Sequence, residues 1–376
     1  MRTAIVSDLH LGSPSGEDVT RDPAIRAHLL DEVRDADRLI LLGDVLELRS
    51  LPLARVLETV QPFFEDLGGA MAGRRVVLVP GNHDHRLAEP LLEEVARAGG
   101  PLGLEHRFPA TAEPATQLAG WLGDAELGIA YPGLWLREDA YATHGHYMDC
   151  HMSLPRLECV AAAAAMRMGG PLSDPAAPDD YERVLRPIYG LAFGLAEAGL
   201  SGRASMPSER AWHAISGGGR NGGQLRRTAA KAAIAAGVPG SVWLLNRLFR
   251  ARFDADLSPS AISRSGVDAA AELARRLRVE AAHTITGHTH RAGPGASDPA
   301  WTVLGGGRLH NTGSWVYADA FHHPGRPPGP YWPGTVTWVE DEGPPRRVDL
   351  LHEVPREELL AAVERLAEQS PTTTRR

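Results

Sequence analysis

Several short apolar segments of the chain are followed by side chains that can bind a metal ion. These side chains are Asp8 and His10 after Thr3–Ser7, Asp44 after Arg38–Leu42, Asn82, His83 and Asp84 after Arg75–Val79, His144 after Ala140–Thr143, and His288 and His290 after Ala282–Thr286. Residues i and i+2 of an extended chain point the same way, so each Asp-x-His or His-x-His pair can converge on one cation. Carboxylate, amide and imidazole ligands suit Mn²⁺, Fe²⁺ or Zn²⁺. The absence of cysteine from the set argues against a purely structural zinc site.

Each of these motifs has an ordinary structural explanation when it stands alone. An isolated Gly43-Asp44 pair would usually be read as a turn or a helix N-cap, and a single histidine such as His144 as structural. Taken together, the seven candidates other than His83 and Asp84 are too many ligands for one catalytic ion with open positions. They fit two divalent ions that share a bridging carboxylate.

The apolar segments are short, rich in β-branched residues and followed by turn residues, which predicts buried strands. Helical patterns at Pro23–Ala36 and Pro52–Met71 separate the first three segments, and another follows at Leu87–Ala98. Alternation of strand and helix predicts an α/β fold with a largely parallel sheet. The candidate ligands then lie where open α/β sheets place their sites, beyond the carboxyl ends of the strands.

The character of the sequence changes after Asp149 and becomes alanine-rich and helical as far as about Val279. Strand patterns resume at Ala282 and continue at Trp301–Leu304, Thr335–Glu340 and Arg347–Leu351, before a final helix at Arg356–Glu368. We therefore expect a core of residues 1–149 and 280–355, a helical cap inserted at 150–279, and a C-terminal helix and tail at 356–376. The glycine-rich stretch 216–223 is interpreted as a hinge rather than a phosphate-binding loop, because no strand precedes it.

The ordered motifs Asp8-x-His10, Gly43-Asp44, Gly81-Asn-His-Asp84, His144 and Gly287-His-x-His290 resemble those of the calcineurin-like metallophosphoesterase superfamily. The resemblance spans residues 8 to 290. It implies a four-layer αββα sandwich, two sheets flanked by helices, which agrees with the strand pattern.

The resemblance also implies roles for the matching residues. Asp8, His10 and His290 would bind one metal ion, Asn82, His144 and His288 would bind the other, and Asp44 would bridge both. His83 would act beside the phosphate as a catalytic residue, and Asp84 would orient His83. Purple acid phosphatases of the same superfamily carry an iron-binding tyrosine where this chain has Glu47, so no ferric–tyrosinate centre is expected.

These features predict hydrolysis of a phosphomonoester, a phosphodiester or a pyrophosphate by a metal-bridging hydroxide. Mn²⁺ is the expected metal, with Fe²⁺ and Zn²⁺ as alternatives. A metal-dependent nuclease or cyclic-nucleotide phosphodiesterase is the alternative activity. A non-catalytic scaffold is the third hypothesis, although such proteins lose ligands that are all present here. His146, Asp149 and His151 lie near His144 and are interpreted as supporting or structural residues.

The position of the helical insertion resembles that in UDP-diacylglucosamine pyrophosphohydrolases, in which an apolar and basic cap precedes the last metal-binding histidines. The insertion here is longer, and those enzymes usually carry arginine at the position of His83. The comparison therefore supports a cap that selects a phosphorylated small-molecule or lipid-like substrate, without identifying lipid A chemistry.

Charge is distributed unevenly along the chain. The formal net charge is −8, which argues against binding to long nucleic acids, yet residues 201–252 contain nine basic residues and one acid. That stretch carries +8 and the remainder −16. The candidates for substrate contact are five of its arginines: Arg220, Arg226, Arg227, Arg247 and Arg250. Together with the apolar segment 242–250, they fit either a solvated, packed helix or a surface for anionic substrates and peripheral membrane contact.

The two cysteines are too few for a disulfide framework, and no signal-peptide pattern precedes the first predicted strand. We therefore expect a cytoplasmic protein, with possible membrane contact through the cap. The sequence does not predict an oligomeric state.

Overall fold

The computed structural model of the chain describes residues 1–201, 239–322 and 327–370. Its strands are β1 (Thr3–Val6), β2 (Arg38–Leu42), β3 (Arg75–Val79), β4 (Glu105–Pro109), β5 (Glu126–Arg137), β6 (Ala140–Thr143), β7 (His283–Thr286), β8 (Arg308–Asn311), β9 (Thr335–Val339) and β10 (Arg346–Asp349). They form one ten-stranded sheet in the order β10-β9-β1-β2-β3-β5-β6-β7-β8, with β4 paired to β5. The fold class is therefore mixed α/β, as predicted.

The sheet curls because strand β5 belongs to both of its halves. The first part of β5 pairs in parallel with β3, from Glu126 opposite Arg75 to Ile129 opposite Leu78. Its last part, from Gly133 onward, pairs antiparallel with β6. One half thus contains the parallel strands β1, β2 and β3, and the other contains the parallel strands β6, β7 and β8.

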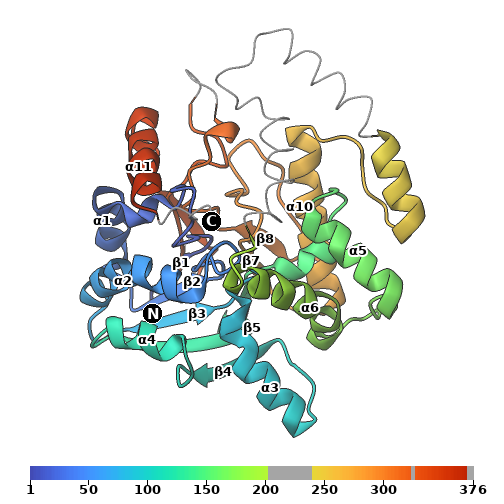
Figure 1. Cartoon of the computed structure of the whole chain (residues 1–376), viewed down its shortest axis with the longest axis horizontal. Coiled ribbons are helices and arrows are strands. Elements are labelled where there is room, and N and C mark those ends of the chain that lie inside the picture. Colours follow the sequence, from blue (N-terminus) through green and yellow to red (C-terminus); the bar gives the residue numbers. More distant parts are fainter. Residues whose placement is uncertain (202–238, 323–326, 371–376) are drawn as a thin grey trace.

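Helices cover the sheet on opposite sides. The α-helices are α1 (Pro23–Val33), α2 (Leu53–Ala70), α3 (Glu89–Ala98), α4 (Ala115–Trp121), α5 (Leu157–Gly169), α6 (Pro178–Glu197), α10 (Pro259–Arg276) and α11 (Arg356–Gln369), and residues 239–249 are also helical. Short 3₁₀ segments are η1 (Val19–Arg21), η2 (His85–Ala88), η3 (His146–Cys150) and η4 (Asp319–Phe321). Helices α1, α2 and α11 lie on one side, and α5, α6 and α10 lie on the other (Figure 1).

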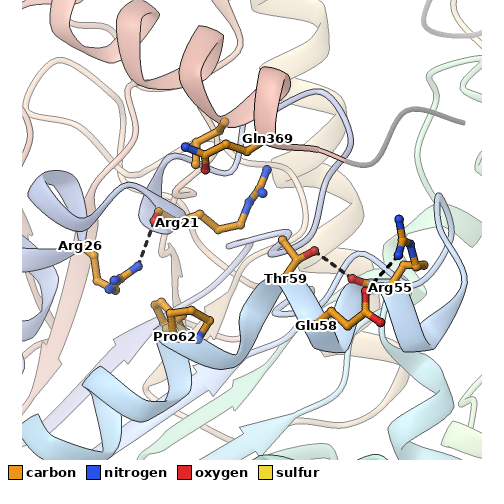
Figure 2. A pocket seen from close by; sticks show the side chains of 9 residues that line it. Arg21, Arg26, Arg55, Glu58, Thr59, Pro62 and Gln369 are labelled. Atoms are coloured by element: carbon orange, nitrogen blue, oxygen red, sulfur yellow. Dashed lines mark hydrogen bonds and ion pairs between the residues drawn. The ribbon is translucent and has the colours of Figure 1, made fainter.

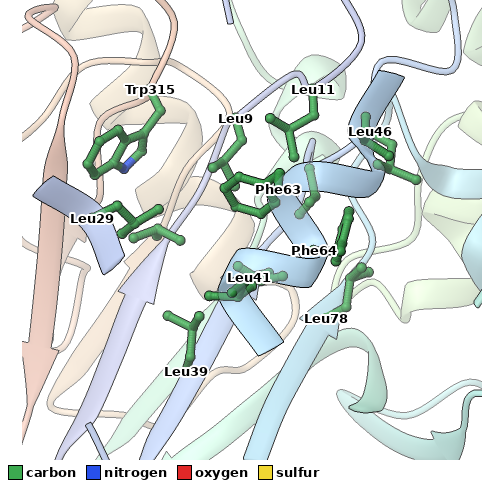
Figure 3. Packing of buried hydrophobic residues seen from close by; sticks show 14 of the residues in the cluster. Leu9, Leu11, Leu29, Leu39, Leu41, Leu46, Phe63, Phe64, Leu78 and Trp315 are labelled. Carbon is green, nitrogen blue, oxygen red and sulfur yellow. The ribbon is translucent and has the colours of Figure 1, made fainter. Parts of the chain in front are cut away.

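Alternation along the strands divides the core into separate apolar clusters. In β2, Leu39 and Leu41 pack with α1 and α2, whereas Ile40 and Leu42 face a cluster that includes Ala142 of β6. Strand side chains alternate between the two faces of a sheet, so one strand can serve both clusters. Phe63 and Phe64 of α2 lie over the first face (Figure 3). Full burial of each contributes about 1.5–3 kcal/mol.

Local sequence signals explain where several helices begin. Asp22 caps α1 by accepting a hydrogen bond from Ala24 N at 3.0 Å, and Pro23 occupies the first helical position. Ser258 caps α10 in the same way at Ala261 N, with Pro259 following it. These helices are therefore specified partly by their first residues as well as by their apolar faces.

Most predicted elements are confirmed within one to three residues, but Trp301–Leu304 is not a strand. Only Thr302 forms a bridge, to Arg308, across a turn in which Gly305 and Gly306 have positive φ. Strands β4, β5 and β8 and helix α4 were not predicted. Strand β8 reads Arg-Leu-His-Asn, which lacks an apolar run, and β5 contains Gly128, Pro132 and Gly133, which normally indicate turns.

The described residues between 150 and 279 contain helices α5, α6, 239–249 and α10 and no strand. They share an apolar cluster that also includes Trp301 and Leu309 of the later part of the chain. The division into core and cap remains a prediction. The glycine-rich stretch 216–223 and Arg220, Arg226 and Arg227 lie outside the described residues.

A buried polar cluster joins α6 to the sheet and to the loop after β3. Glu182 of α6 accepts hydrogen bonds from His85 Nε2 at 3.0 Å, from Tyr147 at 2.5 Å and from Tyr131. Burial raises the pKa of Glu182, but the facing His85 and the two hydroxyl donors lower it overall. The carboxylate therefore stays charged in a buried but fully hydrogen-bonded setting.

Glu182→Ala should lower the free energy of unfolding by about 3–5 kcal/mol, because it leaves three buried donors without their acceptor. Because the folded pKa of Glu182 is lowered, its contribution is complete above the ordinary value of 4.5 and is lost as the pH falls through the lowered value. Urea unfolding at neutral and acidic pH measures both effects. Glu272→Ala, which removes a partly exposed carboxylate from α10, is the matched control and should cost about 1 kcal/mol or less. Equal losses for the two variants would contradict this account.

Candidate metal centre

The structure brings the candidate ligands together at the carboxyl ends of β1, β2, β3, β6 and β7. Three groups have ligand atoms within 4.8 Å of one another: Asp8, His10 and His290; His10, Asp44 and His83; and Asp44, His144 and His288. In the first group, His290 Nε2 lies 3.2 Å from Asp8 Oδ1 and 3.1 Å from His10 Nε2. Residues 280 positions apart therefore converge because the curl of the sheet brings the carboxyl ends of β1 and β7 together.

Asp44 lies between the two outer groups. Its Oδ2 atom is 3.2 Å from His144 Nε2 and 3.7 Å from His10 Nε2, and its Oδ1 atom accepts a hydrogen bond from His83 N at 2.8 Å. Asp44 is 2% exposed. It is thus the one carboxylate of the cluster that faces histidines from both sides, as a bridging ligand would.

The backbone at this edge is held in an uncommon conformation. Seven non-glycine residues of the described chain have positive φ, and five of them are candidate ligands: Asp8 (53°), His10 (45°), Asp44 (50°), His288 (67°) and His290 (59°). Each such residue costs of order 1 kcal/mol or more, and such strain gathers at functional sites. The surrounding fold therefore maintains a side-chain arrangement that local propensity would not favour.

Two glycines allow the strand ends to approach this closely. Gly43 has a φ of +81°, and a Cβ atom there would collide with the ring of His144. A Cβ atom on Gly287 would lie 2.5 Å from Asp8 Oδ2. The glycines before Asp44 and His288 are therefore required by close contact between strand ends from the two halves of the sheet.

The amide of Asn82 is oriented as a metal ligand would be. Its Oδ1 atom lies 3.1 Å from His288 Nδ1 and faces Asp44 Oδ2 at 3.2 Å. His288 Nε2 is hydrogen-bonded to Asp149 at 2.9 Å, which leaves Nδ1 as an acceptor when Nε2 carries the proton. Three lone-pair donors then point at one another. A rotated amide would instead donate to His288 and Asp44 and accept from Arg49, so the orientation with the oxygen toward His288 and Asp44 is the one that a bound cation would favour.

The electrostatics of the cluster also suit a cation. Burial raises the pKa of Asp44, but His144, His83 and His10 outweigh it and hold that pKa well below its usual range. Burial lowers the pKa of His144, and the carboxylates of Asp44 and Asp8 raise it overall to about 10. Both shifts show that these buried carboxylates favour positive charge beside them. The donor set of carboxylates, imidazoles and one amide therefore fits divalent metal ions.

The prediction that Asp84 orients His83 is wrong. Asp84 is fully buried and accepts from the backbone nitrogens of Gly81 at 2.6 Å and Val45 at 2.8 Å, so it fixes the loops after β2 and β3. His83 Nδ1 is instead hydrogen-bonded to Glu47 Oε2 at 2.6 Å. Asp84 does not bond to the neighbouring His83 ring, because four backbone N–H groups surround its carboxylate.

Two further carboxylates, Glu47 and Asp149, orient candidate ligands through hydrogen bonds that the sequence motifs did not predict. Glu47 Oε2 also lies 3.0 Å from His10 Nδ1, so one carboxylate orients two histidines. Asp149, from η3, orients His288. Such partners fix the tautomer and direction of metal-binding imidazoles. The only sequence signal was the proximity of Glu47 to Asp44 and of Asp149 to His144. His146 and His151 bond to Tyr131 and Tyr181.

A separate cavity of about 460 Å³ lies between α2, η1 and α11 and shares no residue with the cluster (Figure 2). Its three arginines already have acidic partners: Arg21 with Asp18, Arg26 with Asp66 and Arg55 with Glu58. The cavity is therefore not linked to the candidate metal centre by geometry or by unpaired charge.

Comparison with known families agrees with this geometry. Residues 1–160 match the calcineurin-like phosphoesterase family. This part of the chain is therefore similar to calcineurin-like phosphoesterases. The matched region contains Asp8, His10, Asp44, Asn82 and His144, while His288 and His290 lie beyond it and join the cluster because β7 pairs in parallel with β6. No curated protein is significantly similar to the chain in sequence.

The match to the calcineurin-like phosphoesterase family supports a hydrolase of phosphoric ester bonds in general, and the clustered histidines and aspartates support divalent-metal binding. Among the described residues, no helix is both long enough and apolar enough to cross a bilayer.

Mn²⁺ should raise the melting temperature of the protein, because an ion that binds only the folded state stabilises it by about 2.7 kcal/mol at 100 times its Kd. Asp44→Asn should lower Mn²⁺ affinity at least about tenfold, since even residues that only support ligands cost that much. Calorimetric titration measures the affinity. Asp18→Asn is the control, because Asp18 is equally buried but bonds to Gly12 and Arg21 outside the cluster. An unchanged affinity in Asp44→Asn would contradict the site.

Proposed function

We propose that the chain is a binuclear metal-dependent phosphoesterase whose ligands are Asp8, His10, Asp44, Asn82, His144, His288 and His290. The observation that carries the proposal is the position of Asp44 between the two outer groups, together with the Asn82 oxygen that faces Asp44 and His288. Asp8, His10 and His290 would hold one ion, and Asn82, His144 and His288 the other. Mn²⁺ is the proposed metal, as expected for this mixture of oxygen and nitrogen ligands.

When bound, the two ions would neutralise the phosphoryl group and lower the pKa of a nearby water. The chain's own residues supply the remaining steps. Glu47 fixes His83 through Nδ1, so the Nε2 atom, which lies 3.3 Å from Arg49 Nη1, is the one that would face the substrate. A proton on Nε2 can stabilise charge on the phosphoryl oxygens or pass to the departing oxygen. Asp84 acts indirectly, through the loops that carry Asp44 and Asn82.

The same proposal covers the finer architecture. The cluster of Ile40, Leu42 and Ala142 lies between the two halves of the curled sheet, and helices cover both outer faces. This arrangement supports an αββα sandwich with residues 150–279 as a helical cap. Helix α5 begins close to the ligand cluster, where Glu158 bonds to Arg49. The cap would therefore select the phosphorylated substrate.

The wild-type protein with Mn²⁺ should hydrolyse p-nitrophenyl phosphate or bis-p-nitrophenyl phosphate, and Asp44→Asn should hydrolyse neither. His83→Ala should retain metal and lower kcat by about 10²–10⁴, the usual contribution of a positioned proton donor. Initial rates measured with metal content on the same samples test both variants. Preference for the diester would favour the nuclease or cyclic-nucleotide phosphodiesterase alternative. Two bound ions without hydrolysis of either compound would favour the scaffold hypothesis.

We also propose that the helical residues 239–249 contact an anionic membrane surface. Trp243, Leu244 and Leu248 are 64%, 56% and 58% exposed, and Arg247 and Arg250 lie among them. Tryptophan and leucine beside arginine are typical of helices that lie in the plane of a membrane interface. The location in the cytoplasm remains a prediction.

In a flotation assay, the protein should float with vesicles that contain about 30% anionic lipid and float less as salt rises. A triple variant of Trp243, Leu244 and Leu248 to serine should stay at the bottom of the gradient. Met168→Ser removes an even more exposed apolar side chain, 84% exposed, from α5 and serves as the control. A wild-type protein that never floats would exclude this contact.

A further inference from the structure

Arg49 lies at the edge of the candidate metal centre, in the loop between β2 and α2. Its side chain is 16% exposed. The Nη1 atom lies 3.3 Å from His83 Nε2, and the Nη2 atom donates to Glu158 at 3.1 Å. One end of the guanidinium is thus held by a carboxylate of α5, while the other end faces the site.

The Asn82 amide makes the space beside Arg49 a position for an anion. Because the Asn82 oxygen faces Asp44 and His288, its Nδ2 atom lies 3.0 Å from Arg49 Nη1. Two N–H donors therefore face each other next to the His83 ring. Donors in this arrangement are satisfied by an oxygen that accepts from both, and an anionic oxygen forms the stronger bonds.

Glu158 keeps Arg49 in this position. Burial raises the pKa of Glu158, but Arg156 and Arg49 lower it overall to about 2, so Glu158 is charged at neutral pH. Glu158 lies in the first turn of α5, whereas Arg49 follows β2, so the ion pair joins the predicted cap to the predicted core. The fixed Nη2 atom leaves Nη1 with its donors directed at Asn82 and His83.

A phosphomonoester and a phosphodiester differ in the number of oxygens that can meet these donors. A monoester has three non-bridging oxygens and a diester has two, and two metal ions can engage two of them. We propose that Arg49 binds the third non-bridging oxygen of a phosphomonoester, with Asn82 Nδ2 as a second donor, and so determines specificity for monoesters over diesters. This inference rests on the proposed function, because the metal-bound site supplies the other contacts to phosphate.

The decisive experiment compares Arg49→Met with Arg186→Met in the Mn²⁺-loaded full-length protein. Arg186 also joins α6 to the core, through Glu89 with Nε–Oε1 at 3.1 Å, but it does not touch the cluster. Calorimetric titration uses inorganic phosphate and, as the monoanion with two non-bridging oxygens, dimethyl phosphate. Hydrolysis uses p-nitrophenyl phosphate and bis-p-nitrophenyl phosphate.

Arg49→Met should weaken phosphate binding by about 10- to 100-fold, the usual effect of losing a hydrogen bond to a charged group. Its kcat/KM for the monoester should fall by a similar factor, while binding of dimethyl phosphate and hydrolysis of the diester change less than about threefold. Arg186→Met should match the wild type. Unchanged phosphate affinity in Arg49→Met, or equal losses for both esters, would overturn the proposal.

Failure of the proposed hydrolase function and failure of the Arg49 contact give different results. If the wild type cleaves neither ester, the proposed function fails, and the phosphate titration still decides whether Arg49 binds an anion. Arg49→Lys keeps the charge without the second N–H group and should fall between the wild type and Arg49→Met. Thermal unfolding and Mn²⁺ content, measured on every variant, separate loss of contact from loss of fold.

Glu158 is a positioning residue in this scheme. Glu158→Ala should raise KM for the monoester with little change in kcat, because it releases Arg49 without altering the metal ligands. Glu158→Gln keeps an acceptor oxygen and should restore much of the affinity. The positioning role would be contradicted if Glu158→Ala and Glu158→Gln lowered the melting temperature and kcat equally and left KM unchanged.

Discussion

The structure depends on two buried carboxylates, Asp8 and Asp44, which are 0% and 2% exposed. A buried carboxylate is stable only when positive charge or hydrogen-bond donors surround it. Here His290 and His144 face the two groups from the other half of the sheet, and the backbone nitrogens of His288 and His83 donate to them. The arrangement of the strand ends therefore surrounds both buried carboxylates with histidines and hydrogen-bond donors.

Left-handed backbone at five candidate ligands is unfavourable locally, and the rest of the fold offsets it. Strands β1, β2 and β3 are buried on both faces, with Leu39 and Leu41 in one apolar cluster and Ile40 and Leu42 in another. Rigid strands end at one edge, so the loops after them need only a few residues to reach a common point. Burial of these apolar strand residues therefore contributes to the free energy that maintains the strained candidate ligands.

Features that depend only on residue type could be predicted from the sequence. Contacts that depend on the direction in which a side chain points could not. The clustering of the candidate ligands was predictable, because histidines and aspartates follow several strands of an α/β fold at their carboxyl ends. The partner of His83 was not, because Asp84 is nearer in sequence but its carboxylate is taken by backbone N–H groups, and Glu47 reaches the ring from another loop. Strand β5 was missed for a related reason: Pro132 indicates a turn, yet here it lies where the sheet curls. No local sequence pattern distinguishes a strand that bends where the sheet curls from a strand that ends in a turn.

Asn82 gives the site a direction that a cluster of charged groups would not have by itself. Its oxygen faces Asp44 and His288, where positive charge is favoured, and its nitrogen faces Arg49, where negative charge is favoured. In the rotated orientation the amide nitrogen would instead donate to His288 and Asp44, and the oxygen would accept from Arg49, so the direction of the amide depends on whether charge is bound on either side. Because Arg49 is in turn held by Glu158 of α5, the placement of that helix and the direction of the amide are physically linked. Displacement of that helix would remove the carboxylate that holds the Arg49 guanidinium beside the candidate metal centre.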